Sequence, residues 1–157
     1  MSIQIDENKI IFTRDFKATA QQIFNAYTEQ SLFEKWFHPQ GATTEVYKFD
    51  VQTGGGAFFA IRAPQGTSYT VTQYNDVVEP QKIDYNDYFA DKDGNIDEKM
   101  AGMHNIIHLT ENDDGTTTLQ STAELPDPKA AQQLLDMGVE EGMNSTFDNL
   151  ARLVENN

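Results

Sequence analysis

The chain contains 157 residues, which suits one domain able to bury roughly two-thirds of its surface on folding. Hydrophobic residues make up 38% and aromatic residues 11%, so there is enough apolar material for a core and wholesale disorder is excluded. The formal net charge of −14 repels phosphate backbones and anionic lipid headgroups, which argues against nucleic acids and membrane surfaces as partners. The absence of cysteine excludes thiol catalysis, thiolate metal ligands and disulfides.

The N-terminal sequence shows no export signal. MSIQIDENKI has neither a basic n-region nor an apolar h-region, and nowhere do 18 apolar residues run together. We therefore expect a cytoplasmic protein. No internal repeat or low-complexity tract divides the chain, so residues 1–157 are predicted to form a single domain.

A strand and two helix starts open the chain. Residues 9–16 (KIIFTRDF) alternate well enough to predict a first strand. Thr19 followed three positions later by Gln22 has the pattern of a capping box, and Ser31 followed by Glu34 repeats it. Because the two starts lie so close together, they predict two short helices in succession.

Between residues 43 and 123 the apolar pattern changes to a period of two, which is typical of antiparallel strands. The alternation places Tyr47 and Phe49 on one face of their strand, and Phe59 and Ile61 on one face of the next. The predicted strands cover residues 45–51, 57–61, 68–78, 82–89, 102–110 and 116–123. With the first strand, this makes an antiparallel sheet of about seven strands.

The last segment predicts one long helix. Asp127 as N-cap and Pro128 at the first helical position open it, and the pattern continues to about residue 155. Its apolar stripe contains Val139, Met143, Phe147, Leu150 and Val154. Because this helix is the only large apolar cover left for the sheet, we expect a curved sheet that wraps around it and leaves space at some places between them.

Five segments carry a resemblance to a known family. They are AYTEQSLFEKWFHPQG (26–41), FDVQTGGGAFFAIRAPQG (49–66), VVEPQKIDY (77–85), ENDDGTTTL (111–119) and EEGMNSTFDNLARL (140–153). In order and spacing they resemble the homologues of the activator of the ninety-kilodalton heat-shock ATPase. That family belongs to the START-related, birch-pollen-allergen-like superfamily of helix-grip proteins, also called SRPBCC.

The resemblance implies an α+β helix-grip fold and an internal hydrophobic cavity in which relatives hold lipids or other apolar molecules. The family name suggests stimulation of a chaperone, although in the eukaryotic co-chaperone that activity looks to depend largely on a separate N-terminal domain. The chain also departs from the pattern. Ala57 and Met143 stand where relatives often carry tryptophan, which either enlarges the cavity or is offset by other aromatic side chains.

We predict that apolar side chains wall this cavity and bury a small apolar ligand without catalysis. The aromatic cluster of residues 27–37 would serve both core and cavity, with Leu32 and Phe33 in the core and Trp36 facing the ligand. The predicted wall consists of Tyr27, Trp36, Tyr47, Phe59, Ile61, Tyr85, Met143 and Phe147.

Arg14 and Asp87 are the candidate polar groups of the cavity. Each shares an alternation phase with apolar neighbours, and a charge on an inner wall is costly unless it is paired. Each residue is therefore a salt-bridged core feature, the polar handle of a pocket, or a residue that a bulge turns outward.

No metal or cofactor is expected. His104 and His108 have a helical metal-binding spacing, but in a strand they would lie roughly 13 Å apart. The segment DKDGNIDEK (91–99) fits a calcium loop in neither register and better suits a hairpin turn. Gly138 and Gly142 either bend the last helix or leave a bare strip for a ligand, and we favour the bend.

Two other classes of function stay open. Some members of the superfamily are cyclases or hydrolases, but no spacing in this sequence singles out a nucleophile with its base or a pair of carboxylates. The third class is protein interaction, in which a chaperone or a homodimer partner would dock on exposed sheet edges or on the acidic surface.

Overall fold

The computed structural model describes residues 2–99 and 102–155 and contains one antiparallel sheet with four helices. The strands are β1 (Ser2–Asp6), β2 (Lys9–Phe16), β3 (Thr43–Phe49), β4 (Gly56–Ala63), β5 (Gly66–Val78), β6 (Lys82–Ala90), β7 (Met103–Glu111) and β8 (Thr117–Glu124). The helices are α1 (Ala20–Thr28), α2 (Gln30–Trp36), α3 (Pro128–Asp136) and α4 (Val139–Glu155).

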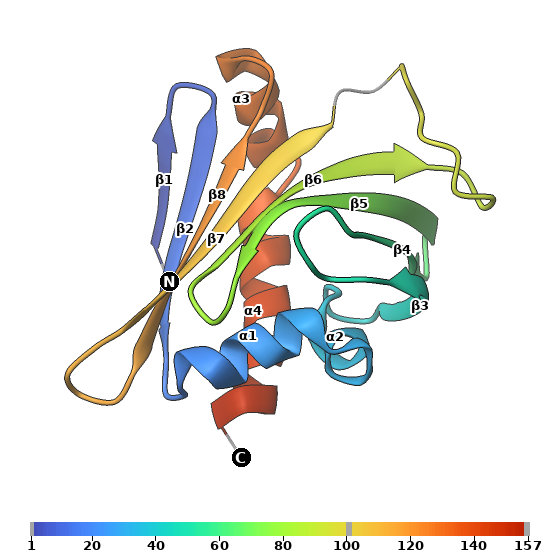
Figure 1. Ribbon diagram of the computed structural model, residues 1–157. Coiled ribbons are helices and arrows are strands. Elements are labelled where there is room, and N and C mark those ends of the chain that lie inside the picture. Colours follow the sequence, from blue (N-terminus) through green and yellow to red (C-terminus); the bar gives the residue numbers. More distant parts are fainter. Residues whose placement is uncertain (1, 100–101, 156–157) are drawn as a thin grey trace.

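The sheet is curved, and its eight strands follow the order β1-β2-β8-β7-β6-β5-β4-β3. Figure 1 shows α4 along one face of this sheet. Helices α1 and α2 lie near the C-terminal end of α4, and α3 lies near its N-terminal end. This arrangement confirms the predicted helix-grip fold. The sheet has one strand more than the seven that we predicted, because β1 is short and mostly exposed and therefore carries little apolar signal.

The helical pair between β2 and β3 is confirmed, but only its first start is as predicted. Thr19 and Gln22 form a complete capping box on α1. The second predicted capping box is wrong, since α2 begins at Gln30 after the extended residue Glu29, which makes no side-chain cap. Glu34 instead accepts hydrogen bonds from the side chain of Gln30 and from the backbone N–H of Val46 in β3.

The C-terminal helix is divided in two, contrary to the single helix predicted from residue 127. Asp127 caps α3 as expected, by accepting a hydrogen bond from the N–H of Ala130. The break lies at Gly138, whose φ of +87° is left-handed and therefore suits glycine. Gly142 lies inside the first turns of α4. Thus Gly138 redirects the chain before the long helix begins.

The core lies between the concave face of the sheet and α4. Phe16 of β2 and Phe147 of α4 are fully buried and meet edge to face, with ring centroids 6.2 Å apart. Leu119 of β8 and Leu150 of α4 are also fully buried. These contacts anchor the C-terminal half of α4 to the sheet.

Candidate functional site

A chamber of about 230 Å³ lies between the concave face of the sheet and the first half of α4. All the elements around it contribute side chains, from α1, α2 and the turn that follows, from β4, β6, β7 and β8, and from α4. The lining residues are Tyr27, Trp36, Phe37, His38, Pro39, Ile61, Tyr85, Asp87, Met103, Asn105, Ile107, Ser121, Met143, Thr146 and Phe147.

Most of the predicted wall residues meet at this chamber. Tyr27, Trp36 and Ile61 line it on the side of α1, α2 and β4. Phe59 does not line it, but borders a void of about 20 Å³ beside it. Tyr27, Phe37, Tyr85 and Asp87 line both spaces and form the wall between them.

The aromatic cluster of α1 and α2 fixes one end of the chamber. Trp36 is fully buried, and its indole N–H donates a 2.8 Å hydrogen bond to the carbonyl of Ala26 in the last turn of α1. Carbonyls in a last helical turn have no partner inside the helix, so the indole satisfies one of them. The indole also meets the ring of Tyr27 edge to face, with 4.8 Å between centroids. Phe33 packs in the core, as predicted.

The turn after α2 is tied to α4 beside the chamber. The amide of Asn149 donates a 2.9 Å hydrogen bond to the carbonyl of His38, and the hydroxyl of Ser145 accepts one of 2.7 Å from the N–H of Gln40. These bonds hold His38 and Pro39 against the part of α4 that carries Met143 and Phe147.

Asp87 is the charged group on the chamber wall. It extends from β6 and is largely buried, and the hydroxyl of Thr72 in β5 donates a 2.6 Å hydrogen bond to its Oδ1. Burial raises the pKa of Asp87 to about 6, because loss of hydration outweighs the opposing effect of that hydrogen bond. Asp87 thus lines the chamber, and its role as the polar handle of a pocket stays a prediction.

Three tyrosines surround Asp87 without using their hydroxyl groups in hydrogen bonds within the described residues. They are Tyr27, Tyr74 and Tyr85, and burial raises the pKa of each, with the charge of Asp87 adding to the effect at Tyr74 and Tyr85. In the described part of the chain, no buried side-chain nitrogen or oxygen is sealed off without a partner. The three phenols therefore stay neutral at ordinary pH and retain access to open space.

Tyr47 is not a wall residue, contrary to the prediction. A bulge in β3 shifts the pairing with β4 between Val46 and Lys48, so the alternation changes phase at this point. The side chain of Tyr47 lies on the outer face, 45% exposed, where its ring packs against Phe58. Val46 packs toward the core in its place.

Arg14 does not line the chamber either. Its guanidinium lies 2.8 Å from a carboxylate oxygen of Asp148 in α4 and 5.3 Å from the ring centroid of Phe16. Arg14 therefore ties β2 to α4 at the edge of the core, which corresponds to the salt-bridged alternative.

Several wall residues were missed by sequence reasoning. Met103, Asn105 and Ile107 lie two apart in β7 and face the chamber together, and Ser121 of β8 pairs with Ile107. The alternation of β7 could have revealed them, but the polar Asn105 and Ser121 weaken the apolar signal. His38 also lines the chamber, although nothing in its sequence context indicated a partner.

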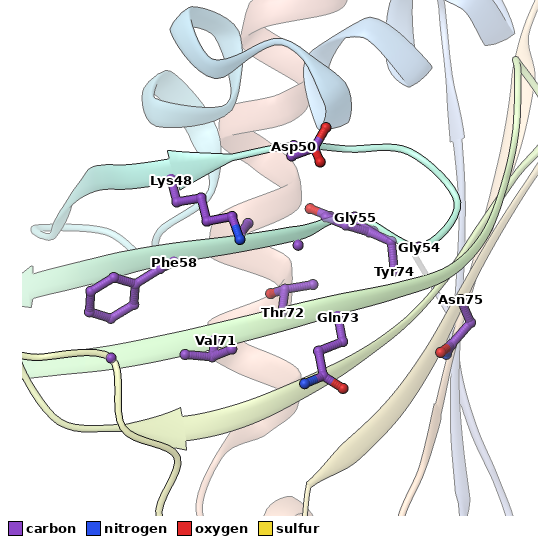
Figure 2. A pocket seen from close by; sticks show the side chains of 13 residues that line it. Lys48, Asp50, Gly54, Gly55, Phe58, Val71, Thr72, Gln73, Tyr74 and Asn75 are labelled. Atoms are coloured by element: carbon purple, nitrogen blue, oxygen red, sulfur yellow. The ribbon is translucent and has the colours of Figure 1, made fainter.

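A larger hollow of about 600 Å³ lies elsewhere, beside the Gly54–Gly56 loop (Figure 2). Its rim carries the exposed side chains of Lys48, Asp50, Gln73 and Asn75. A ligand there would remain in contact with water and with flexible polar side chains. The smaller chamber buries a ligand better, because most of its wall is apolar.

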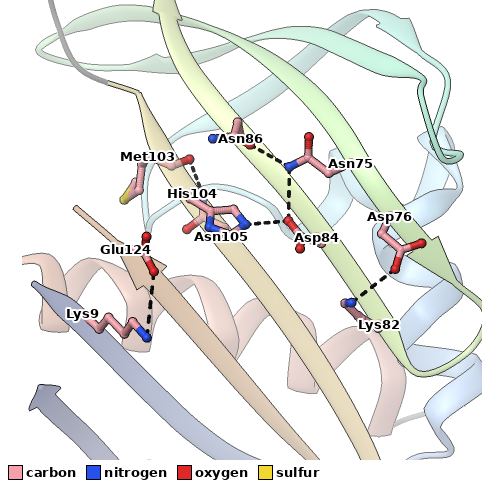
Figure 3. Close-up of polar contacts among 10 residues, drawn as sticks. All are labelled: Lys9, Asn75, Asp76, Lys82, Asp84, Asn86, Met103, His104, Asn105 and Glu124. Carbon is pink, nitrogen blue, oxygen red and sulfur yellow. Dashed lines mark hydrogen bonds and ion pairs between the residues drawn. The ribbon is translucent and has the colours of Figure 1, made fainter. Parts of the chain in front are cut away.

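A polar cluster lies at the strands β5, β6 and β7 (Figure 3). The Nε2 of His104 is 2.6 Å from Oδ1 of Asp84, and the amide of Asn75 donates to the same oxygen and to Asn86. Burial acts to raise the pKa of Asp84, but the hydrogen bonds from His104 and Asn75 outweigh it and hold the pKa below its usual value. The cluster links three strands and does not line the chamber.

Within residues 2–99 and 102–155, no three His, Cys, Asp or Glu side chains gather closely enough to hold a metal ion. None of the helices that the structure describes has the length and apolar character needed to span a bilayer.

Comparison with known proteins places this fold. Residues 17–155 match the model of the family described as activator of Hsp90 ATPase homolog 1-like protein. A Staphylococcus epidermidis protein solved by NMR is 49% identical, with a TM-score of 0.91 over 99% of this chain and 94% of that one. A crystal structure from Mycobacterium smegmatis is 27% identical, with a TM-score of 0.88 over 98% and 95% of the two chains.

A more distant structure shares the fold alone. An AHSA1 protein from Silicibacter pomeroyi is 19% identical, with a TM-score of 0.72 over 92% of this chain and 95% of that one. Among curated proteins, none matches this chain. The family match spans nearly the whole chain and agrees with the helix-grip fold, so the protein belongs to the activator of Hsp90 ATPase homolog 1-like family.

Proposed function

We propose that this protein binds a small apolar ligand in the chamber between the sheet and α4, without catalysing a reaction. The observation that carries the proposal is the chamber itself, about 230 Å³ of space whose wall is mostly aromatic and aliphatic. The family to which this protein belongs commonly binds hydrophobic ligands. Burial of the ligand against Tyr27, Trp36, Ile61, Met143 and Phe147 would supply the affinity, with about 1 to 2 kcal/mol from each ring or chain that it contacts.

The size of the chamber restricts the ligand. An apolar cavity of about 150 Å³ accommodates benzene, and pockets for drug-sized ligands begin near 300 Å³. A chamber of about 230 Å³ therefore suits a ligand of one or two rings, or a branched molecule of similar size. A long-chain lipid would need the chamber to expand.

Native mass spectrometry of freshly purified protein, followed by solvent extraction, tests the proposal. We expect an excess mass of a few hundred daltons at most on part of the protein, and an apolar compound in the extract. The purified protein should also bind 2-naphthol, a neutral two-ring probe, in calorimetry. Protein that carries no compound and binds no such probe would contradict ligand binding.

Filling the chamber should prevent binding. Met143 of α4 lines the chamber, so the substitution Met143→Trp places an indole in the space that the ligand would occupy. We expect 2-naphthol to bind at least tenfold more weakly to this variant. The matched control is Met137→Trp, because Met137 is 80% exposed between α3 and α4. Equal affinity of the two variants would mean that the probe binds elsewhere.

The other two classes of function predict different results. A co-chaperone would change the ATP turnover of the cognate heat-shock ATPase on mixing, and Met143→Trp should not alter that effect. A cyclase or hydrolase would consume a compound from a metabolite pool, and the consumption would depend on a chamber residue such as Asp87. We favour binding because the chamber wall offers one carboxyl group and no paired nucleophile and base among the described residues.

A further inference from the structure

We propose that the ligand of the chamber carries a protonated amine, and that the carboxylate of Asp87 binds this cation while the surrounding aromatic rings face it. This inference rests on the proposed binding function and specifies the chemistry of the ligand. It would make the site one for a small apolar amine, with the apolar part held by the inner wall of the chamber and the charged nitrogen at β6.

The first argument is that Asp87 has no cationic partner among the described residues. The cations of the observed ion pairs are Lys9, Arg14, Arg62, Lys82 and His104, and each of them pairs with a different carboxylate. A largely buried carboxylate without a cation is costly, so such groups are normally paired. An amine on the ligand would supply the missing charge.

The second argument is that one oxygen of Asp87 is available. Thr72 donates its hydroxyl proton to Oδ1, and the described residues provide no donor to Oδ2. Every described buried oxygen without a hydrogen-bond partner keeps some open space beside it, so Oδ2 opens onto a space that Asp87 lines. The spaces that Asp87 lines are the chamber, the void beside it and a third space of about 130 Å³ that Asp87 shares with Thr70, Tyr88, Phe89 and Met103. The carboxylate can therefore accept a hydrogen bond from a ligand without breaking the one from Thr72.

The third argument is the aromatic wall around the carboxylate. Tyr27, Phe37 and Tyr85 line the same two spaces as Asp87, and Trp36 lines the chamber. The faces of aromatic rings attract cations, and this attraction strengthens when the cation is desolvated. No lysine or arginine lines either space, so an incoming amine meets no competing side-chain cation among the lining residues.

The net charge acts in the same direction. At −14 the protein attracts organic cations and repels organic anions, which raises the association rate of an amine over that of an apolar acid of equal size. A neutral hydroxyl on the ligand could also donate to Oδ2, but it would leave the charge of the carboxylate uncompensated. The comparison between amine and alcohol is therefore the decisive one.

The test uses three probes that share one ring and differ in their charged or polar end. They are 2-phenylethylamine, 2-phenylethanol and 3-phenylpropanoate, measured by calorimetry with the full chain at pH 7.5. We expect the amine to bind at least tenfold more tightly than the alcohol, and the propanoate to bind most weakly. Asp87→Asn should lower the affinity for the amine at least tenfold and change the affinity for the alcohol less than threefold. The control Asp84→Asn removes a carboxylate outside the chamber and should change neither.

Acidification gives a second measurement that needs no variant at Asp87. Since burial raises the pKa of Asp87 to about 6, only about a tenth of this group is ionised at pH 5, and the amine should bind roughly tenfold more weakly there than at pH 7.5. The other titratable groups near it are Tyr88 beside the third space, His38 on the chamber wall, and the buried phenols of Tyr27, Tyr74 and Tyr85. The phenols stay neutral in this range, and the variant His38→Gln shows whether the histidine contributes.

The outcomes separate this inference from the function on which it rests. If the alcohol binds as tightly as the amine, or if Asp87→Asn leaves the affinity for the amine unchanged, the cationic ligand is contradicted while apolar binding stands. If pH dependence disappears in His38→Gln, the histidine and not Asp87 governs it, which also contradicts the inference. If none of the three probes binds and 2-naphthol also fails to bind, both proposals are overturned.

Discussion

Replacing Trp36 with alanine is expected to lower the free energy of unfolding by about 4 kcal/mol. The side chain is fully buried, so its removal leaves a large cavity in the core. The carbonyl of Ala26 also loses the hydrogen bond from the indole. The edge-to-face contact with Tyr27 is lost as well. Urea denaturation followed by far-UV circular dichroism measures the change.

The variant Trp36→Phe separates packing from the hydrogen bond. It retains an aromatic ring against Tyr27 and Phe33 but cannot donate to Ala26, so we expect a loss of about 2 kcal/mol. A loss below about 1 kcal/mol for Trp36→Ala would show that α1 and α2 are not packed as described. It would also mean that these two helices do not close one end of the chamber.

Replacing Asp87 with asparagine is expected to stabilise the protein at pH 8 by about 2 kcal/mol. The folded state holds the pKa of Asp87 at about 6, whereas the ordinary pKa of an aspartate carboxyl group is 3.8. The folded state therefore binds a proton more tightly than the unfolded state, and the contribution to stability is full below pH 4 and is lost as pH rises through 6. A difference of about two units between the folded and unfolded pKa corresponds to about 3 kcal/mol. The expected gain in stability is smaller, because the carboxyl group keeps some contact with water.

The pH dependence is what identifies the cause. The advantage of Asp87→Asn over the natural chain should shrink between pH 8 and pH 4 and disappear there, since an asparagine amide can still accept the hydrogen bond from Thr72. The matched control is Asp113→Asn in the exposed turn between β7 and β8, which should follow the natural chain at every pH. An advantage that is independent of pH would mean that the charge of Asp87 is not the destabilising group.

Much of the fold could be predicted because its signals are local. The alternation in residues 9–16 and the capping pair of Thr19 and Gln22 describe single elements, and the structure confirms both. The end of α1 was harder to predict, because Glu29 adopts an extended conformation without proline or glycine nearby. The sequence predicts a bend at Gly138 and not a break, since a glycine in a helical pattern does not reveal its φ angle.

The site was predictable where side chains keep the phase of their strand. Phe59 and Ile61 face inward because β4 pairs regularly with β5, and Tyr85 faces inward because β6 pairs regularly with β7. The prediction for Tyr47 was wrong because one extra residue in β3 turns its side chain outward, and a bulge leaves no mark in the hydrophobic pattern. For Arg14 the sequence left three alternatives open, and the salt-bridged one could not be chosen because the partner Asp148 lies 134 positions away in the sequence.

Trp36 has a consequence beyond its packing. It is the only tryptophan of the chain, and it borders the chamber while its indole is shielded from solvent. The ultraviolet emission of this one residue therefore originates beside the proposed ligand. Any molecule that enters will change the surroundings of a single, known fluorophore, so the unlabelled protein can itself report when the chamber fills.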